Sequence, residues 1–146
     1  MRIESPSFQN NQPIPKKYAC DGEDINPPLI VSDVPPEAKS LVLIVDDPDA
    51  PRGAWVHWTL WNIPPQPMEI LENSVPNGAV EGLTDFGRSG YGGPCPPLGT
   101  HHYFFKLYAL DTILIIPSSI RAGDLEKAID GHILDQAELV GLYSRE

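Results

Sequence analysis

Acidic residues cluster after a strongly apolar run, and a histidine follows them. Residues 46–51 read Asp-Asp-Pro-Asp-Ala-Pro, directly after the apolar run 41–45. Asp and Pro in such a pattern commonly form a turn in which the carboxylates bond their own backbone, although a carboxylate that closes a buried strand can point into a cleft. We expect either role for Asp49 and favour the cleft for Asp47. His57 becomes a functional candidate if another polar group joins it.

The segment 90–103 holds a second set of candidate residues. It reads Gly-Tyr-Gly-Gly-Pro-Cys-Pro-Pro-Leu-Gly-Thr-His-His-Tyr, which is incompatible with a helix or a central strand over its first part. Its prolines stiffen the chain, and its glycines allow backbone N–H groups to surround a small anion. The alternative is a rigid loop without a ligand. Because side chains alternate along a strand, His101 shares a face with Tyr103, and His102 points outward.

Short β-strands are the elements that must position these residues. Proline and glycine separate four runs rich in Val, Ile, Leu or aromatic residues, and strands joined by turns indicate a sandwich or barrel. The predicted strands are Leu29 to Val31, Leu41 to Val45, Trp55 to Ile63 and Tyr103 to Leu110. In the third strand, alternation places four side chains on one face, namely Trp55, His57, Thr59 and Trp61.

Helical patterns occur only near the end of the chain. Asp124 is a possible N-cap for a helix whose apolar positions are Leu125, Ala128 and Ile129, with Gly131 ending it. A second short helix is predicted from about Ile133 to Tyr143. No internal repeat or flexible linker divides the chain, so we expect one β-rich domain over residues 1–146.

Composition excludes several classes of protein. The 146 residues carry a formal net charge of -10, with a pI near 4.7, and 41% of them are hydrophobic. Nucleic acid is an unfavourable partner because its phosphates are bound by clustered Lys and Arg. A membrane-spanning helix needs about 20 apolar residues, far more than the longest apolar run, 41–45. We expect no transmembrane segment and a cytoplasmic or already mature protein, since the first residues lack the apolar region of a secretory signal.

The two cysteines, Cys20 and Cys95, match no paired zinc spacing and no dense disulfide framework. We expect reduced thiols, with a single bridge between them as the alternative.

Two motifs together resemble the phosphatidylethanolamine-binding protein family, also called the Raf kinase inhibitor protein family, in its bacterial and archaeal branch. The first is DPDAP at 47–51 followed by W-x-H-W at 55–58, and the second is GGPCPPxGTHxYxFxLYALD at 92–111. The resemblance covers nearly the whole chain. It implies a mainly β fold, a β-sandwich of two antiparallel sheets, to which the predicted C-terminal helices are added, with an end pocket for phosphate-like anions and no cofactor or metal. Carried over by motif position, the ligand-binding residues are Asp47, His57, Gly93, Cys95, Pro96, His101 and Tyr103, and the pocket wall is Asp49, Pro51 and Trp55.

Two positions depart from the family pattern, and the first is Val31, which stands where the family often has Trp. His102 stands where the family typically has Arg, which removes a permanent charge and leaves a salt bridge to the 47–51 turn in question.

Three classes of function follow. Binding of a phosphate-bearing small molecule or phospholipid headgroup ranks first, and the resemblance also allows inhibition of a protein partner, such as a kinase or serine protease, and a homodimer. An enzyme ranks lower: it would be a hydrolase with Asp47, His57 and His101 as acid and base groups and Cys95 as nucleophile, or a metal-dependent enzyme with two histidines and one carboxylate as ligands. A structural adaptor without a ligand is the third class.

Overall fold

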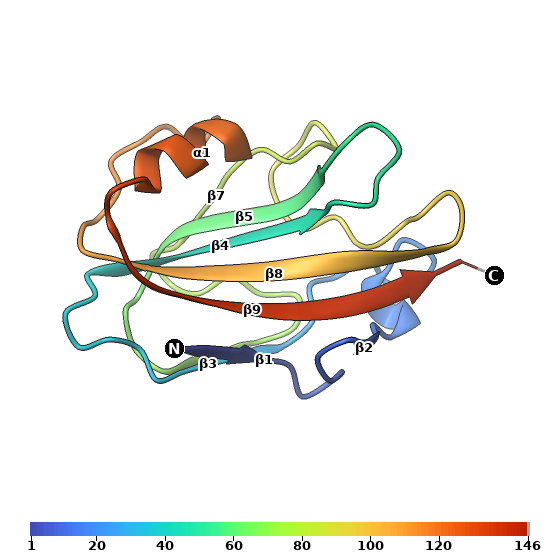
Figure 1. Ribbon diagram of the computed structural model, residues 1–146, viewed down its shortest axis with the longest axis horizontal. Helices are drawn as coiled ribbons and strands as arrows, with labels where there is room; N and C mark the ends of the chain where they lie inside the picture. Colours follow the sequence, from blue (N-terminus) through green and yellow to red (C-terminus); the bar gives the residue numbers. More distant parts are fainter. Residues whose placement is uncertain (146) are drawn as a thin grey trace.

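Two β-sheets form the body of the protein (Figure 1). The computed structural model describes residues 1–145. Its elements are β1 (Arg2–Glu4), β2 (Gln12–Pro13), the 3-10 helix η1 (Lys16–Tyr18), β3 (Leu29–Ser32), β4 (Ser40–Asp47), β5 (Trp55–Ile63), β6 (Met68–Ile70), β7 (Val80–Glu81), β8 (Thr100–Leu110), α1 (Ala122–Ile129) and β9 (Ile133–Ser144).

The larger sheet has the strand order β2-β9-β8-β4-β5-β7, and the smaller sheet has the order β1-β3-β6. Between these strands every pairing is antiparallel except that of the short β2 with β9. The predicted class, mainly β with two sheets, is confirmed. The four predicted strands correspond to β3, β4, β5 and β8.

Strand β4 is buried on both faces, which explains its continuous apolar sequence. Leu41, Leu43 and Val45 face the smaller sheet and belong to the main core. Val42 and Ile44 face the opposite way and pack in a second apolar cluster beneath α1. Figure 1 shows this layering, with α1 above the larger sheet and β1 and β3 below it. The central strand is therefore held from two sides, and its end at Asp47 has a fixed position.

Helix α1 begins earlier than predicted. Its N-cap is Arg121, and Asp124 lies inside the first turn, where its charge is favourable near the positive end of the helix. The helix ends at Ile129, shortly before Gly131, whose φ of 83° breaks the helical geometry.

The predicted second helix over 133–143 is wrong, because this segment is strand β9. It pairs with β8 along its length, from Thr100 opposite Ser144 to Leu110 opposite Ile133. Ala, Gln, Glu and Leu in this stretch favour a helix locally, but the free edge of the long β8 offers a full ladder of hydrogen bonds. Tertiary pairing therefore overrides local preference here.

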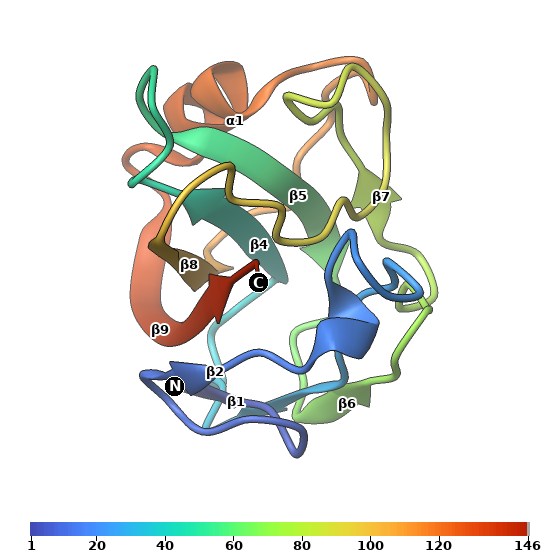
Figure 2. The ribbon, with the colours of Figure 1, turned by 90° about the vertical axis from the view of Figure 1, so that its right-hand side faces the viewer.

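The expectation of reduced cysteines is also wrong, since Cys20 and Cys95 form a disulfide. The segment after η1 lies against the segment before β8: the Cys20 N–H donates to the Pro94 carbonyl at 3.0 Å. Figure 2 views this end of the sandwich, where the yellow segment before β8 crosses the ends of β4 and β5. The spacing of cysteines in a sequence does not indicate contacts between segments so far apart. It therefore could not favour a Cys20–Cys95 bridge over reduced thiols.

Candidate functional site

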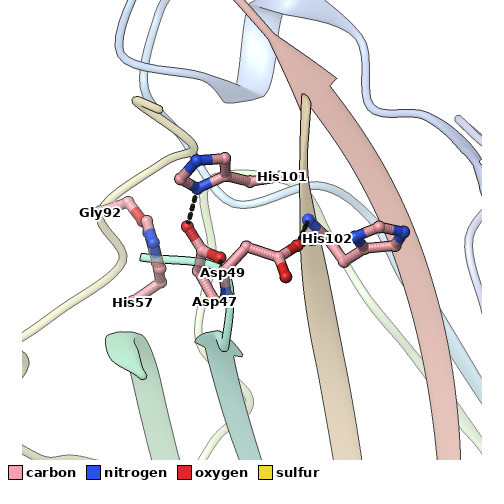
Figure 3. A network of polar contacts seen from close by, with 6 residues as sticks. All are labelled: Asp47, Asp49, His57, Gly92, His101 and His102. Atoms are coloured by element: carbon pink, nitrogen blue, oxygen red, sulfur yellow. Dashed lines mark hydrogen bonds and ion pairs between the residues drawn. The ribbon is translucent and has the colours of Figure 1, made fainter. Parts of the chain in front are cut away.

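A buried histidine–carboxylate pair lies where β4 ends and β8 begins. His101 Nδ1 is 2.6 Å from Asp47 Oδ2, and both side chains are almost fully buried. Strand β4 extends through Asp47, so this carboxylate is the last residue of a central strand rather than part of the following turn. The strand ladder places both residues on the inner face. The carboxylate therefore holds the His101 ring in one orientation (Figure 3).

The turn after β4 is locked by a second pair. The Asp49 N–H donates to Asp47 Oδ1 at 2.8 Å, so both oxygens of Asp47 are engaged. Asp49 turns away toward His102, whose backbone N–H and Nδ1 lie 2.8 and 2.6 Å from Asp49 Oδ2 (Figure 3). These hydrogen bonds from His102 lower the pKa of Asp49. His102 therefore fastens the 47–51 turn through both contacts with Asp49, and its side chain points outward as predicted.

His57 reaches the same place through a bulge in β5. Val45 pairs with Trp58 and Asp46 with Val56, so His57 is an extra residue in the ladder. The predicted common face of Trp55, His57, Thr59 and Trp61 is therefore wrong. Trp61 packs beneath α1, whereas His57 lies on the inner face with its ring edge-on to Tyr103 at 5.2 Å. The bulge breaks the alternation on which that prediction depended.

The His57 ring is tied to the loop that precedes β8. His57 Nδ1 lies 2.7 Å from the Gly92 carbonyl oxygen, and the Gly92 N–H donates to the His57 carbonyl at 2.9 Å. Burial lowers the pKa of His57, although the Gly92 carbonyl and nearby carboxylates oppose this effect. The ring is therefore a neutral group near pH 7, held by its Nδ1 atom.

Gly93 has a structural role at this point. Its N–H donates to Asp24 Oδ1 at 2.7 Å, and a Cβ on Gly93 would lie 2.3 Å from the Tyr18 carbonyl oxygen. The glycine permits close approach of two backbone segments, next to the disulfide that joins them. Its amide hydrogen already bonds Asp24, and Gly93 does not line the cavity.

These elements enclose a cavity of about 300 Å³ at the end of the larger sheet. Its lining comes from the 47–51 turn, the start of β5, the loop before β8 and β8 itself. The lining residues are Asp47, Ala50, Pro51, Trp55, His57, Phe86, Cys95, Pro96, Pro97, His101 and Tyr103. Of the residues carried over by motif, Gly93 and Asp49 lie outside this lining, and the others lie within it.

Three lining residues were not predicted: Ala50, Phe86 and Pro97. Ala50 and Pro97 lie within the two motifs. Phe86 comes from a separate turn that Asp85 fastens to β5, since the Val56 N–H donates to Asp85 Oδ2 at 2.7 Å. In the sequence, the only available signal was a phenylalanine placed between the turn-forming residues Asp85 and Gly87.

The Tyr103 hydroxyl is buried and has no hydrogen-bond partner among the described residues. Burial raises the pKa of Tyr103, and the Asp47 charge raises it further. A buried polar group without a partner in the protein costs free energy, so the Tyr103 hydroxyl is left able to bond a molecule in the cavity. The cavity thus combines the Tyr103 hydroxyl with the Nε2 atoms of His57 and His101, the ring nitrogens that are not bonded to the protein.

Two chemical alternatives, a cysteine nucleophile and a metal centre, can be compared with this geometry. Cys95 is bonded to Cys20 and has no free thiol in this structure, so it is not available as a nucleophile. Within residues 1–145, no three His, Cys, Asp or Glu side chains are arranged to hold a metal ion.

No helix of this part of the chain has the length and apolar character needed to cross a membrane.

The fold is a β-sandwich, and the pocket at its end combines the Asp47–His101 pair with His57 of the β5 bulge. These features define a class of ligand-binding β-protein. Residues 4–144 match the family model described as phosphatidylethanolamine-binding protein, and the chain belongs to this family. A UPF0098 protein of Methanothermobacter thermautotrophicus is 49% identical, with 99% of each chain covered. A UPF0098 protein of Chlamydia trachomatis is 46% identical over the full length of both.

Two solved structures share the fold. The phosphatidylethanolamine-binding protein homologue CT736 from Chlamydia trachomatis superposes with a TM-score of 0.95 at 45% identity, covering 99% of this chain and 97% of the other. YbcL of Escherichia coli, described as a member of the mammalian family, gives 0.92 at 30% identity, covering 99% and 98%. The predicted family is confirmed.

Proposed function

We propose that the cavity binds a small phosphate-bearing molecule, either inorganic phosphate or a phosphorylated headgroup. Membership in the family supports a ligand-binding role. The observation that carries the proposal is the meeting of His57, His101 and the unpartnered Tyr103 hydroxyl in one cavity. Hydrogen bonds to an anion are about twice as strong as those between neutral groups, and they strengthen further where water is excluded.

Asp47 is compatible with an anion beside it because both of its carboxylate oxygens already bond groups of the protein. One oxygen accepts the Asp49 N–H, and the other faces His101 Nδ1. Because Asp47 Oδ2 accepts from Nδ1, a second hydrogen on the His101 ring is carried by Nε2, which donates it into the cavity. The net charge of -10 acts from farther away and is screened over about 8–10 Å.

The walls of the cavity select a ligand with an apolar part. The rings of Trp55 and Phe86 meet edge-to-face at 5.5 Å, and both are partly exposed at the cavity. Leu98, in the same loop as the lining prolines, is 85% exposed. A volume of about 300 Å³ is at the lower limit for small-molecule sites, so a headgroup fits inside and any acyl chain would remain outside.

We rank binding above hydrolysis because Cys95 lacks a free thiol and each histidine uses Nδ1 within the protein. Inhibition of a kinase or serine protease, a homodimer and a cytoplasmic location stay predictions. The disulfide bears on the last of these, since disulfides persist mainly in oxidising compartments.

Calorimetric titration with inorganic phosphate and phosphoethanolamine tests the proposal. In a His101→Asn variant, the amide nitrogen replaces Nδ1 and keeps the bond to Asp47, while the ligand-facing Nε2 is removed. A charged hydrogen bond contributes about 1.5–3 kcal/mol, so phosphate affinity should fall about 10- to 100-fold. Phosphate at about 100 times its Kd should stabilise the wild type by about 2.7 kcal/mol.

A matched control is available at the other end of β8. His132 Nδ1 lies 2.8 Å from Asp111 Oδ1, an exposed pair distant from the cavity. The His132→Asn variant should bind phosphate as the wild type does. Absence of phosphate and phosphoethanolamine binding to the folded wild type, with an unchanged melting temperature, would contradict the proposal and favour a structural adaptor.

A further inference from the structure

The tautomer of His57 is set by its hydrogen bond to Gly92. A carbonyl oxygen can only accept, so the 2.7 Å contact requires a hydrogen on His57 Nδ1. In a neutral imidazole the other nitrogen, Nε2, then carries a lone pair and no hydrogen. His57 therefore presents an acceptor to the cavity, unlike the donor that an anion site would be expected to show.

The surroundings of His57 keep the ring neutral. The side chain is almost fully buried, with the edges of Phe86 and Tyr103 packed against it at 5.3 and 5.2 Å. Burial lowers the pKa of His57 more than its neighbours raise it. The charged or titratable groups around it are Asp46 and Asp47 of β4, His101 and Tyr103 of β8, Asp24 of the segment bonded to Gly93, and Arg88, which lies over the Phe86 ring.

The cavity thus offers two different kinds of polar atom. Tyr103 is a hydroxyl that stays protonated, and His101 in its imidazolium form donates from Nε2. His57 Nε2 accepts. A ligand that satisfies all three must carry oxygens that accept and one hydroxyl that donates.

We propose that the pocket selects oxyanions that carry a proton, which they donate to His57 Nε2. The inference rests on the proposed function and deepens it. Hydrogen phosphate and the monoanion of a phosphate monoester fit, and sulfate, which has the same shape but no proton near neutral pH, is rejected. Sulfate would place an oxygen lone pair against the lone pair of Nε2, or would require protonation of a buried ring.

Sulfate is the decisive probe in calorimetric titrations at pH 7. A site built to bond a ligand hydroxyl can reject an analogue that lacks it by about 10⁴-fold, and we expect sulfate to bind at least about tenfold more weakly than phosphate. Methyl phosphate adds a second test. Its second ionisation falls near pH 6, so its affinity relative to inorganic phosphate should drop by about tenfold per pH unit above that value.

Two asparagine variants separate the roles of the histidines. His57→Asn keeps a donor for the Gly92 carbonyl and removes the acceptor at Nε2, so the preference for phosphate over sulfate should shrink. His101→Asn should weaken both anions equally and leave their ratio unchanged. Circular dichroism confirms that each variant is folded.

Nitrogen NMR of the histidine rings in the wild type reads the tautomer without any substitution. A hydrogen on Nδ1 and none on Nε2 of His57 near pH 7 is expected. Equal binding of sulfate and phosphate, or a protonated Nε2, would overturn the inference while leaving the proposed function in place. Failure of both anions to bind would overturn the proposed function itself.

Discussion

Replacement of Asp47 by Asn should change the pH dependence of phosphate binding. Asp47 accepts two hydrogen bonds, one from the Asp49 N–H and one from His101 Nδ1. Asn offers a single acceptor oxygen. If that oxygen stays on the Asp49 N–H, its NH₂ group faces His101 Nδ1, and the ring proton must move to Nε2. The neutral ring then donates from Nε2 without being charged.

The size of the effect follows from the two kinds of hydrogen bond. In the wild type, Asp47 Oδ2 accepts from His101 Nδ1, so Nε2 carries a hydrogen only when the ring holds a second one, and anion affinity should fall as the pH rises. A bond from a charged group contributes about 1.5–3 kcal/mol and a neutral one about 0.5–1.5 kcal/mol. Asp47→Asn should therefore bind phosphate up to roughly tenfold more weakly at acidic pH, and this deficit should shrink as the pH rises.

Calorimetric titration at pH 6, 7 and 8 measures this, with the variant-to-wild-type ratio at each pH cancelling the ionisation of phosphate. We also expect a loss of about 1–3 kcal/mol in the free energy of unfolding from the altered buried bond. Asp111→Asn, in the exposed pair with His132, is the control and should change neither property. Equal pH slopes in variant and wild type, or no phosphate binding by the variant at pH 8, would refute the reasoning.

Three further predictions concern the scaffold. Cys20→Ser opens a bridge across 75 positions and should cost roughly 2–4.5 kcal/mol, measured by denaturant unfolding, and intact mass should rise by two hydrogens when the wild type is reduced. Gly93→Ala should lower the free energy of unfolding by about 1–3 kcal/mol because its Cβ would meet the Tyr18 backbone. Gly123→Ala, in open space within α1, should instead raise it by up to about 1 kcal/mol. Thermal melts that give the same sign for both variants would be contrary evidence. The lowered pKa of Asp49 stabilises the fold above its unfolded value of 3.8, so His102→Ala should be less stable than wild type at pH 5, and the difference should shrink as the pH falls below that value; a pH-independent difference would speak against this pair.

Strand content was predictable from the sequence because burial on both faces leaves uninterrupted apolar runs. Leu41 to Val45 and the aromatic-rich stretch from Trp55 each carried this pattern, and both are central strands. Alternation also placed His101 beside Tyr103 correctly, since β8 has regular pairing there. Local rules work where the ladder is regular.

Apart from the face assigned to β5, which a bulge altered, the failures share one cause: partners distant in sequence decided the outcome. The segment 133–143 has helical composition and becomes a strand because β8 lies beside it. Cys20 meets Cys95 because their backbones are bonded nearby. Asp85 fastens to β5 the turn that brings Phe86 to the cavity. Asp24 accepts the hydrogen bond that the Gly93 N–H donates. None of these pairings leaves a periodic signal.

The bulge at His57 in β5 has a consequence for how related chains should be compared. The W-x-H-W letters at 55–58 are easy to find by matching, yet a relative that kept them and paired regularly with β4 would place its histidine opposite Asp46. The ring would then lie on the other face of the sheet, away from the cavity. Such a relative could retain most of the motif and still be unable to hold an anion, so strand register, and not identity alone, should decide which homologues inherit the pocket.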